Sequence, residues 1–363
     1  MAALLNELQI ILFDKSNYST LVLFADISNR VSNLSFSTRI PGGFEFCDFK
    51  ITLPRGMAHN WYAIAPIHYF KLEIRCGQEI VWEGRVEDVE VIPEGLQVHC
   101  AGFFSSCRDR GEPTASVAGA DADAQIADIL TDACVDINSD QSNIGNSGAA
   151  ALASFTSNIA QDMILQLAGQ GNGSGAVWDF AIWEAPLSDT DRAPTAYFAA
   201  RPTSTITWRT SLDKFVGQSL GLRRSIYDLV NRYSNADISS TLSEDTTSQT
   251  EYKRRDRVAT IDTNEAETVI TRQKDMPPSG RSSIGLVYTT SGAIRPLWAV
   301  RAGTLLQIDD VAYIGRQITT VRDQLAVLYI ARTVYNADQN TLEIEWEGPA
   351  VGIASMLQAA GVK

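Results

Sequence analysis

Apolar and polar positions alternate along much of the first hundred residues, and a period of two is the mark of a half-buried β-strand. Such runs, some of them continuously apolar, occur at 8–13, 21–24, 33–40, 44–46, 49–51, 70–75, 80–91 and 96–103. Turn-forming sequences such as Pro41-Gly42-Gly43 and Pro93-Glu94-Gly95 separate them. Short strands separated at regular intervals by turn residues predict an antiparallel sandwich or barrel, in which Trp82 is expected to pack.

The pattern changes after Arg110. Residues 111–119 are rich in Gly, Pro, Ser and Ala and predict a linker. Apolar positions at helical spacing predict a helix over 121–133 and a second helix that begins near Ser157, with Ser157 or Asn158 as its cap. Strands are expected at 177–183, 195–200 and 205–208, so this part of the chain is mixed α and β.

A third part of the chain begins near Ser225 and returns to strands. Strands are expected at 226–233, 283–288, 304–308, 311–318, 325–335 and 341–346, and a helix at 264–274. The Ser/Thr-rich stretch 239–250 predicts an exposed loop.

These patterns predict a mainly β protein with an α/β insertion. The domains expected are a first β domain at 1–110, a mixed α/β insertion at 111–222, a second β domain at 223–350 and a C-terminal tail at 351–363. The second β domain carries a helical and loop excursion at about 239–282.

Charge and hydropathy exclude some classes of protein. The net charge is −13, so no basic surplus is available for gripping the phosphates of nucleic acid. No run of 18 apolar residues is present, so no membrane-spanning helix is expected. Residues 1–13 are apolar but lack a basic leader and a cleavage site, and Leu8 to Phe13 is therefore expected to be a strand rather than part of a secretory signal.

The cysteines favour free thiols. Their number is odd, five in all: Cys47, Cys76, Cys100, Cys107 and Cys134. An odd number in a chain of this length does not indicate a disulfide framework. No CxxC pair is present and the spacings match no iron–sulfur ligand pattern, so no zinc, iron–sulfur cluster or other cofactor is expected.

Motifs for catalysis are weak. The segment Gly217 to Gly221 fits the GxSxG nucleophile elbow around Ser219, which needs a later histidine. All three histidines, His59, His68 and His99, precede Ser219, so a plain turn is favoured. There is no P-loop and no HExxH sequence.

Two further patterns have ordinary structural interpretations. Gly171 to Ala176 fits a loose dinucleotide-binding pattern, but it follows a helix and precedes a strand, the reverse of the order that the motif requires. Glu343, Glu345 and Glu347 alternate with Ile344 and Trp346, as on a strand with one solvated face. We therefore expect no enzymatic activity.

The densest basic cluster consists of Lys253, Arg254, Arg255 and Arg257. A solvated, ion-paired surface is one interpretation. The other is a subunit contact, in which the cluster meets the acidic surplus of a neighbouring copy.

Several segments, taken in order, resemble the baseplate or tail-tip hub proteins of long-tailed phages. These are the hairpin 81–86 with 96–102, the helix 157–169 followed by the aromatic strand 178–180, then 229–233, 252–255 and 300–308. In the last segment Thr304 stands where an acid is common in that family, so a salt bridge from this position is not expected.

The resemblance implies two antiparallel barrels or sandwiches similar to the tail-tube fold, with an α/β insertion. It also implies a homotrimeric ring that adapts a sixfold tail tube to a threefold spike or fibre. The implied partners are other copies of the chain, the distal tail or tail tube protein, the spike or fibre protein and the tape measure protein. DNA would pass through the channel without specific binding, helped by acidic walls. The implied location is the tail tip of the virion, after assembly in the host cytoplasm.

Three alternatives stay open at this point. One is the distal tail ring protein. Another is a carbohydrate- or receptor-binding tail module, for which Trp178, Trp183 and Trp208 are candidate exposed aromatics. The last is a tail-associated cell-wall hydrolase, which is disfavoured because the chain leaves no unassigned stretch of about 100 residues.

Overall fold

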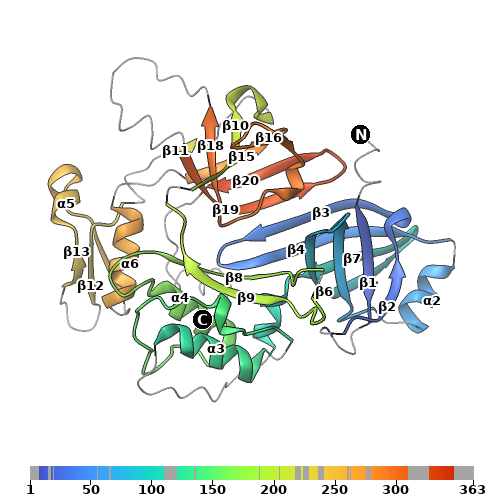
Figure 1. The fold of residues 1–363 in the computed structure, drawn as a ribbon, viewed down its shortest axis with the longest axis horizontal. Coiled ribbons are helices and arrows are strands. Elements are labelled where there is room, and N and C mark those ends of the chain that lie inside the picture. The colour runs from blue at the N-terminus through green and yellow to red at the C-terminus, as the bar shows by residue number, and fades with distance from the viewer. Residues whose placement is uncertain are drawn as a thin grey trace.

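The computed structural model describes residues 8–14, 18, 20–54, 56–64, 67–109, 121–134, 136–187, 189–203, 205–216, 222–223, 229–235, 241–259, 261, 263–274, 279–309 and 327–346. Strands are the commonest secondary structure among these residues, and Figure 1 shows them as two groups with helices below and beside them. The mainly β fold class with an α/β insertion is thus confirmed.

The strands of the first β section form a continuous antiparallel sheet in the order β2–β1–β5–β6–β7–β4–β3. Their bounds are β1 (Gln9–Phe13), β2 (Leu23–Asp26), β3 (Val31–Arg39), β4 (Gly42–Thr52), β5 (Lys71–Cys76), β6 (Glu79–Ile92) and β7 (Gly95–Ala101). The alternating apolar side chains face a common core, in which Trp82 is fully buried as predicted. The helix α2 (Met57–Ile64) follows β4 and was not predicted.

The second β section runs in the order β11–β15–β20–β19–β18–β10–β16–β17. Its strands are β10 (Ile206–Ser211), β11 (Leu222–Arg223), β15 (Ser279–Ile284), β16 (Val287–Thr289), β17 (Ile294–Arg295), β18 (Leu305–Asp309), β19 (Val327–Asn336) and β20 (Thr341–Trp346). The pairing of β10 with β18 is parallel, and the other pairings are antiparallel. The strand predicted at 311–318 lies outside the described residues.

A strand pairing joins the two β sections. β3 pairs antiparallel with β19, so both sections belong to one sheet, and their buried side chains form one apolar cluster. Closing the first section into a barrel would require β3 to pair with β2, but the second edge of β3 is occupied by β19. Among the described strands, the first section is therefore an open, curved sheet rather than a closed barrel.

The α/β section has its own core below the sheet (Figure 1). It consists of α3 (Ala122–Ala133), α4 (Ala160–Gly169), β8 (Trp178–Trp183) and β9 (Thr195–Ala200). β8 also makes a short parallel pairing with the start of β4. Gly43 is required there, because a Cβ at its position would lie 2.1 Å from the carbonyl oxygen of Ile182.

The start of α4 differs from the prediction. The N-cap is Ile159, and it makes no side-chain capping bond. Ser157 instead accepts a hydrogen bond from the Ile159 amide at 3.2 Å and donates one to Asp162 at 2.8 Å. The polar residue before the helix is thus used to hold the preceding turn, not the first helical amide.

A small lobe projects from the remainder of the molecule at the left of Figure 1. It consists of β12 (Arg232–Asn235), β13 (Thr241–Glu244), α5 (Thr246–Tyr252), β14 (Asp256–Ala259) and α6 (Thr263–Gln273). The expectation of an exposed loop over 239–250 was wrong, because β13 and most of α5 lie there. Asp245 caps α5 by accepting a hydrogen bond from the Ser248 amide at 2.7 Å. This short polar helix has no apolar periodicity from which it could be predicted.

Short 3-10 helices complete the secondary structure, at Ser28–Arg30, Phe103–Arg108, Gln141–Asn143, Leu212–Lys214 and Leu297–Ala299. Within the ranges given above, no helix is long and apolar enough to cross a membrane. The predicted domain boundaries stay a prediction. β10 falls in the predicted insertion by sequence, yet it hydrogen-bonds to β16 and β18 of the second β section.

Candidate functional site

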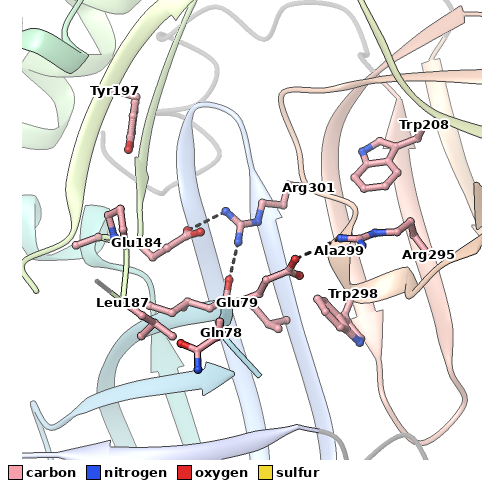
Figure 2. Close-up of a pocket in the computed structure, with 14 residues that line it drawn as sticks. Gln78, Glu79, Glu184, Leu187, Tyr197, Trp208, Arg295, Trp298, Ala299 and Arg301 are labelled. Atoms are coloured by element: carbon pink, nitrogen blue, oxygen red, sulfur yellow. Dashed lines mark hydrogen bonds and ion pairs between the residues drawn. The ribbon is translucent and has the colours of Figure 1, made fainter. Parts of the chain in front are cut away.

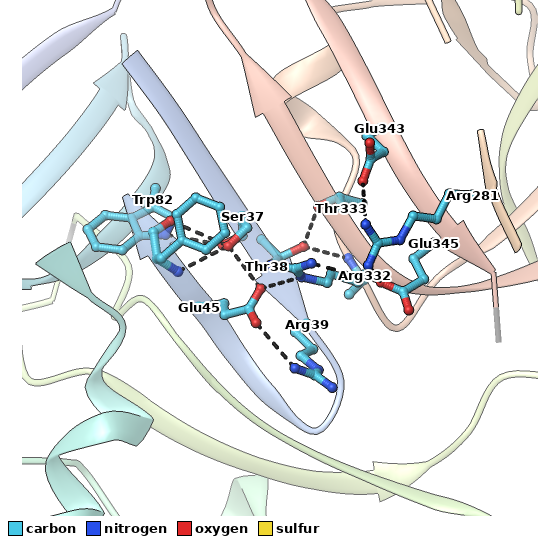
Figure 3. A network of polar contacts seen from close by, with 12 residues as sticks. Ser37, Thr38, Arg39, Glu45, Trp82, Arg281, Arg332, Thr333, Glu343 and Glu345 are labelled. Atoms are coloured by element: carbon cyan, nitrogen blue, oxygen red, sulfur yellow. Dashed lines mark hydrogen bonds and ion pairs between the residues drawn. The ribbon is translucent and has the colours of Figure 1, made fainter. Parts of the chain in front are cut away.

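The contacts that unite the β sections and the α/β section form an extended polar network. Its centre is the β3–β19 seam, where Thr38 lies opposite Thr333. The two hydroxyls are hydrogen-bonded at 2.6 Å, and the amide of Ala302 donates to the Thr38 hydroxyl at 2.8 Å (Figure 3). Both threonines are buried. Because buried polar groups are costly unless they are paired, this arrangement stabilises a single register of β3 against β19.

Charged side chains line the rim of the same seam (Figure 3). The Glu45 carboxylate accepts hydrogen bonds from Arg332 at 2.6 Å and from Ser37 at 3.0 Å, and it forms an ion pair with Arg39 at 3.3 Å. Arg332 comes from β19, whereas Glu45 comes from β4. The Glu45–Arg332 ion pair therefore connects β19 with β4, and the contacts of Ser37 and Arg39 with the same carboxylate bring in β3.

Arg301 connects all three sections (Figure 2). One guanidinium nitrogen lies 2.8 Å from the Glu184 carboxylate, which follows β8, and another donates to the Ile80 carbonyl of β6 at 2.6 Å. The guanidinium also lies over the rings of Phe44 and Trp183, with centroid distances of 5.2 and 5.3 Å. A planar cation with several donors can make all of these contacts at once, which a lysine cannot do.

A buried charge cluster links the first β section to the loop between β8 and β9. Lys71, Glu73 and Glu83 are all fully buried. The Lys71 amine lies 3.2 Å from Glu73 and 3.0 Å from Glu83, and it donates to the Arg192 carbonyl at 2.8 Å. Arg192 also reaches Glu73, at 2.9 Å.

The two acids of this cluster are shifted in opposite directions. Burial raises the pKa of Glu83 to about 7, against a smaller opposing effect of Lys71. Burial also acts to raise the pKa of Glu73, but Lys71, Arg192 and Arg75 outweigh it and lower that pKa. Glu73 is thus held as a carboxylate by three cations, whereas Glu83 is close to its titration point near neutral pH.

The described residues contain no candidate metal site. They include no group of three or more His, Cys, Asp and Glu side chains placed to hold a metal ion. His99 lies 2.8 Å from Asp48 on the exposed face of β7 and β4. His59 lies on α2, and His68 lies in the turn before β5. Ser219 and the GxSxG segment lie outside the described residues.

All five cysteines are free thiols, and four of them are buried. Cys47 and Cys100 lie opposite each other across β4 and β7, and burial raises the pKa of both thiols. Burial also raises the pKa of Cys107, next to Cys134. Thiols with raised pKa values are poor nucleophiles and poor metal ligands.

The predicted basic cluster is not part of these junctions. It lies on the small lobe, where Lys253, Arg254 and Arg255 follow α5 and are exposed, and Arg257 lies in β14 and is half-buried. Arg254 forms an ion pair with Asp256 at 2.6 Å. A role of this cluster in subunit contact stays a prediction.

The three candidate tryptophans have different environments. Trp178 packs against Phe198, and Trp183 packs edge-on against Phe44 beneath Arg301. Trp208 lines a pocket between the sections. The Gly171–Ala176 segment forms a turn in which the Asn172 side chain accepts from two backbone amides of the same turn.

Sequence reasoning missed the residues of the junctions. Alternation of Lys71, Glu73 and Arg75 within a strand indicates a polar face, and that face is solvated in most sheets. Here the loop that carries Arg192 covers that face and helps to bury the cluster. Arg301 falls in the segment 300–308 that carries the family resemblance, but the sequence does not identify its partners.

Solved structures with the same fold come from phage tails and a related secretion system. No protein-family model and no curated protein sequence matches the chain. A tail protein from Neisseria meningitidis MC58 has a TM-score of 0.58 at 10% identity, over 96% of this chain and 98% of that one. The prophage tail protein gp18 from Listeria monocytogenes has a TM-score of 0.54 at 13% identity, over 98% and 99%.

A component of the Escherichia coli type VI secretion system is similar too. Its TM-score is 0.50 at 9% identity, over 93% of this chain and 76% of that one, and it is described as structurally similar to the phage T4 tail proteins gp27 and gp5. These matches cover nearly the whole chain and include both β sections and the α/β section. The chain therefore has the fold of these phage tail proteins, as the sequence resemblance implied.

Proposed function

We propose that the protein is the structural hub of a phage tail tip or baseplate. In this role three copies form a ring that adapts the sixfold tail tube to a threefold spike or fibre and lines the channel for DNA. The distal tail or tail tube protein, the spike or fibre protein and the tape measure protein are the proposed neighbours.

The β3–β19 seam is the observation that carries this proposal. It joins two sheet-forming sections of one chain edge to edge, with a buried threonine pair and the Glu45–Arg332 ion pair fixing the register. A chain whose two β sections are held in one fixed orientation can supply two positions of a sixfold ring. Three such chains then complete the ring and retain threefold symmetry.

The charge of the chain supports a channel that does not bind DNA. At a net charge of −13, the protein has no basic surplus for phosphate contacts, and acidic walls repel the backbone of passing DNA. The proposed role is structural and involves no catalysis.

The basic cluster on the small lobe is the proposed subunit contact. Lys253, Arg254 and Arg255 are exposed on a lobe that projects from the main body (Figure 1). An acidic neighbour provides the complementary charge.

Native mass spectrometry of the purified protein tests the assembly. A species of three times the 39.6 kDa chain mass supports the hub, whereas a hexamer indicates the distal tail ring and a monomer counts against both rings. Arg255→Glu is expected to weaken the trimer, and Arg30→Glu provides a matched control on an exposed residue of the first β section. If Arg255→Glu and Arg30→Glu changed the fraction of trimer equally, the lobe would not be the subunit contact.

A further inference from the structure

A covered polar face lies between the first β section and the α/β section. Leu72, Ile74 and Trp82 on β5 and β6 belong to the apolar core of the sheet. Glu73 and Glu83 alternate with these residues along the strands and therefore point to the opposite face. That face is solvated in an uncovered sheet, yet both glutamate side chains are fully buried here.

Part of the cover is the segment 189–194, which leads into β9 and is called the covering segment below. The carbonyl of its Arg192 accepts a hydrogen bond from the Lys71 amine at 2.8 Å. The guanidinium of Arg192 lies 2.9 Å from the Glu73 carboxylate. Both contacts reach the buried charge cluster, so the position of the covering segment depends on the charges in that cluster.

The cluster brings two like charges together. Glu73 and Glu83 lie directly opposite each other in the pairing of β5 with β6, a position in which two carboxylates repel. The Lys71 amine contacts both acids and the Arg192 carbonyl, so its three N–H donors are all engaged. Arg75 and Arg192 add two cations to Glu73, whereas Lys71 is the one cation in contact with Glu83 among the described residues.

The other charged groups around Glu83 do not compensate its charge. Arg85, two positions further along β6, forms ion pairs with two other acids. Glu184, which follows β8, is paired with Arg301 at 2.8 Å. Neither carboxylate oxygen of Glu83 makes a well-aligned hydrogen bond with a described residue. Burial raises the pKa of Glu83 to about 7, and the negative charge of Glu184 adds to this effect.

Displacement of the covering segment would admit water to the two acids. A glutamic acid in water has a pKa of about 4.3, so Glu83 would release its proton there at neutral pH. The covered state therefore binds more protons than the uncovered state, and a rise in pH favours the uncovered state. With pKa values of about 7 and about 4.3, the equilibrium constant for opening increases about tenfold between pH 6 and pH 8.

From this arrangement we propose that the covering segment is a proton-linked latch between the α/β section and the first β section. It stays docked while one of the two facing acids holds a proton, and it opens more readily once that proton is lost. The β3–β19 seam and the contacts of Arg301 keep the sections joined when it opens. The latch is a property of a single chain and does not rest on the proposed ring.

Hydrogen exchange of the full chain, measured by mass spectrometry at pH 6 and pH 8, tests the latch. After correction for the intrinsic pH dependence of exchange, peptides over 189–196 are expected to lose about tenfold in protection at pH 8. Their exchange should also be insensitive to low concentrations of urea, because a local opening exposes little surface. Peptides over β20 report global unfolding. If the peptides over 189–196 share their protection and urea dependence, the segment has no opening of its own and the proposal is overturned.

Two variants make the test specific to Glu83. Glu83→Gln is neutral at both pH values, so the tenfold difference is expected to disappear. Glu79→Gln is the matched control, since Glu79 lies on the same strand but is 56% exposed, and it should retain the parental difference. A tenfold difference that persists in Glu83→Gln contradicts the latch. If Glu83→Gln does not fold, the parent protein decides alone, because a flat profile between pH 6 and pH 8 overturns the proposal.

Discussion

Arg301 is expected to be the side chain whose loss most weakens the union of the three sections. Arg301→Ala removes the ion pair with Glu184, the hydrogen bond to the Ile80 carbonyl and the contacts with the rings of Phe44 and Trp183. It changes no strand residue, so the pairing of β3 with β19 is left in place.

The structure allows the magnitude to be worked out. A hydrogen bond from a charged donor contributes about 1.5–3 kcal/mol. Each cation–π contact contributes about 0.5–1 kcal/mol where water has access, and the ion pair about 1 kcal/mol or less, since Arg301 and Glu184 are 26% and 21% exposed. One side chain makes all of these contacts and their energies do not simply add, so we expect a loss of about 3 kcal/mol.

Urea unfolding followed by tryptophan fluorescence measures this loss. Arg281→Ala is the matched control, because Arg281 pairs with Glu343 and Glu345 at 3.6 and 3.5 Å but is 59% exposed. Its expected cost is below about 1 kcal/mol. Arg301→Lys is expected to fall between the two, since an ammonium group keeps the charge but not the planar fork. The reasoning is refuted if Arg301→Ala and Arg281→Ala lower stability equally.

Three further predictions concern the buried junctions. Because the pKa of Glu83 is raised to about 7, unfolding releases its proton, and this acid lowers the free energy of unfolding as pH rises from 5 to 8. Glu83→Gln should reduce that loss by about 2–3 kcal/mol, measured by urea unfolding at a series of pH values. Thr38→Val leaves the Ala302 amide without its acceptor, so calorimetry should show a loss of about 2 kcal/mol in the free energy of unfolding. An unchanged melting temperature would contradict the hydrogen bonding described at the seam. Gly43→Ala should destabilise far more than Gly77→Ala, since both glycines have positive φ but only the first has backbone atoms within 3 Å of an added Cβ; equal expression and melting would argue against the β4–β8 contact.

Local periodicity of apolar residues predicted many of the strands and helices. Strand positions around Ile344 follow from alternation, since one face of β20 is buried and the other is half-buried, whereas both faces of β6 are buried around Trp82. The helices α3 and α6 likewise follow from apolar spacing. The lobe elements over 241–252 were missed because they are short and polar, and tertiary contacts rather than periodicity stabilise them.

The junctions could not have been predicted from the sequence. Glu45 and Arg332 are far apart in the chain and meet only because β3 pairs with β19, and no local pattern encodes that pairing. The same holds for Glu73 and Arg192. Burial then gives these charges an importance that identical residues on a solvated strand would lack.

Electron cryomicroscopy of assembled particles tests the central claim most directly. The account predicts three copies of this chain in one ring at the tail tip, each supplying its two β sections side by side around the channel, with the β3–β19 seam inside each copy. Six copies in a ring, a location away from the tail, or a seam formed between different copies would contradict it.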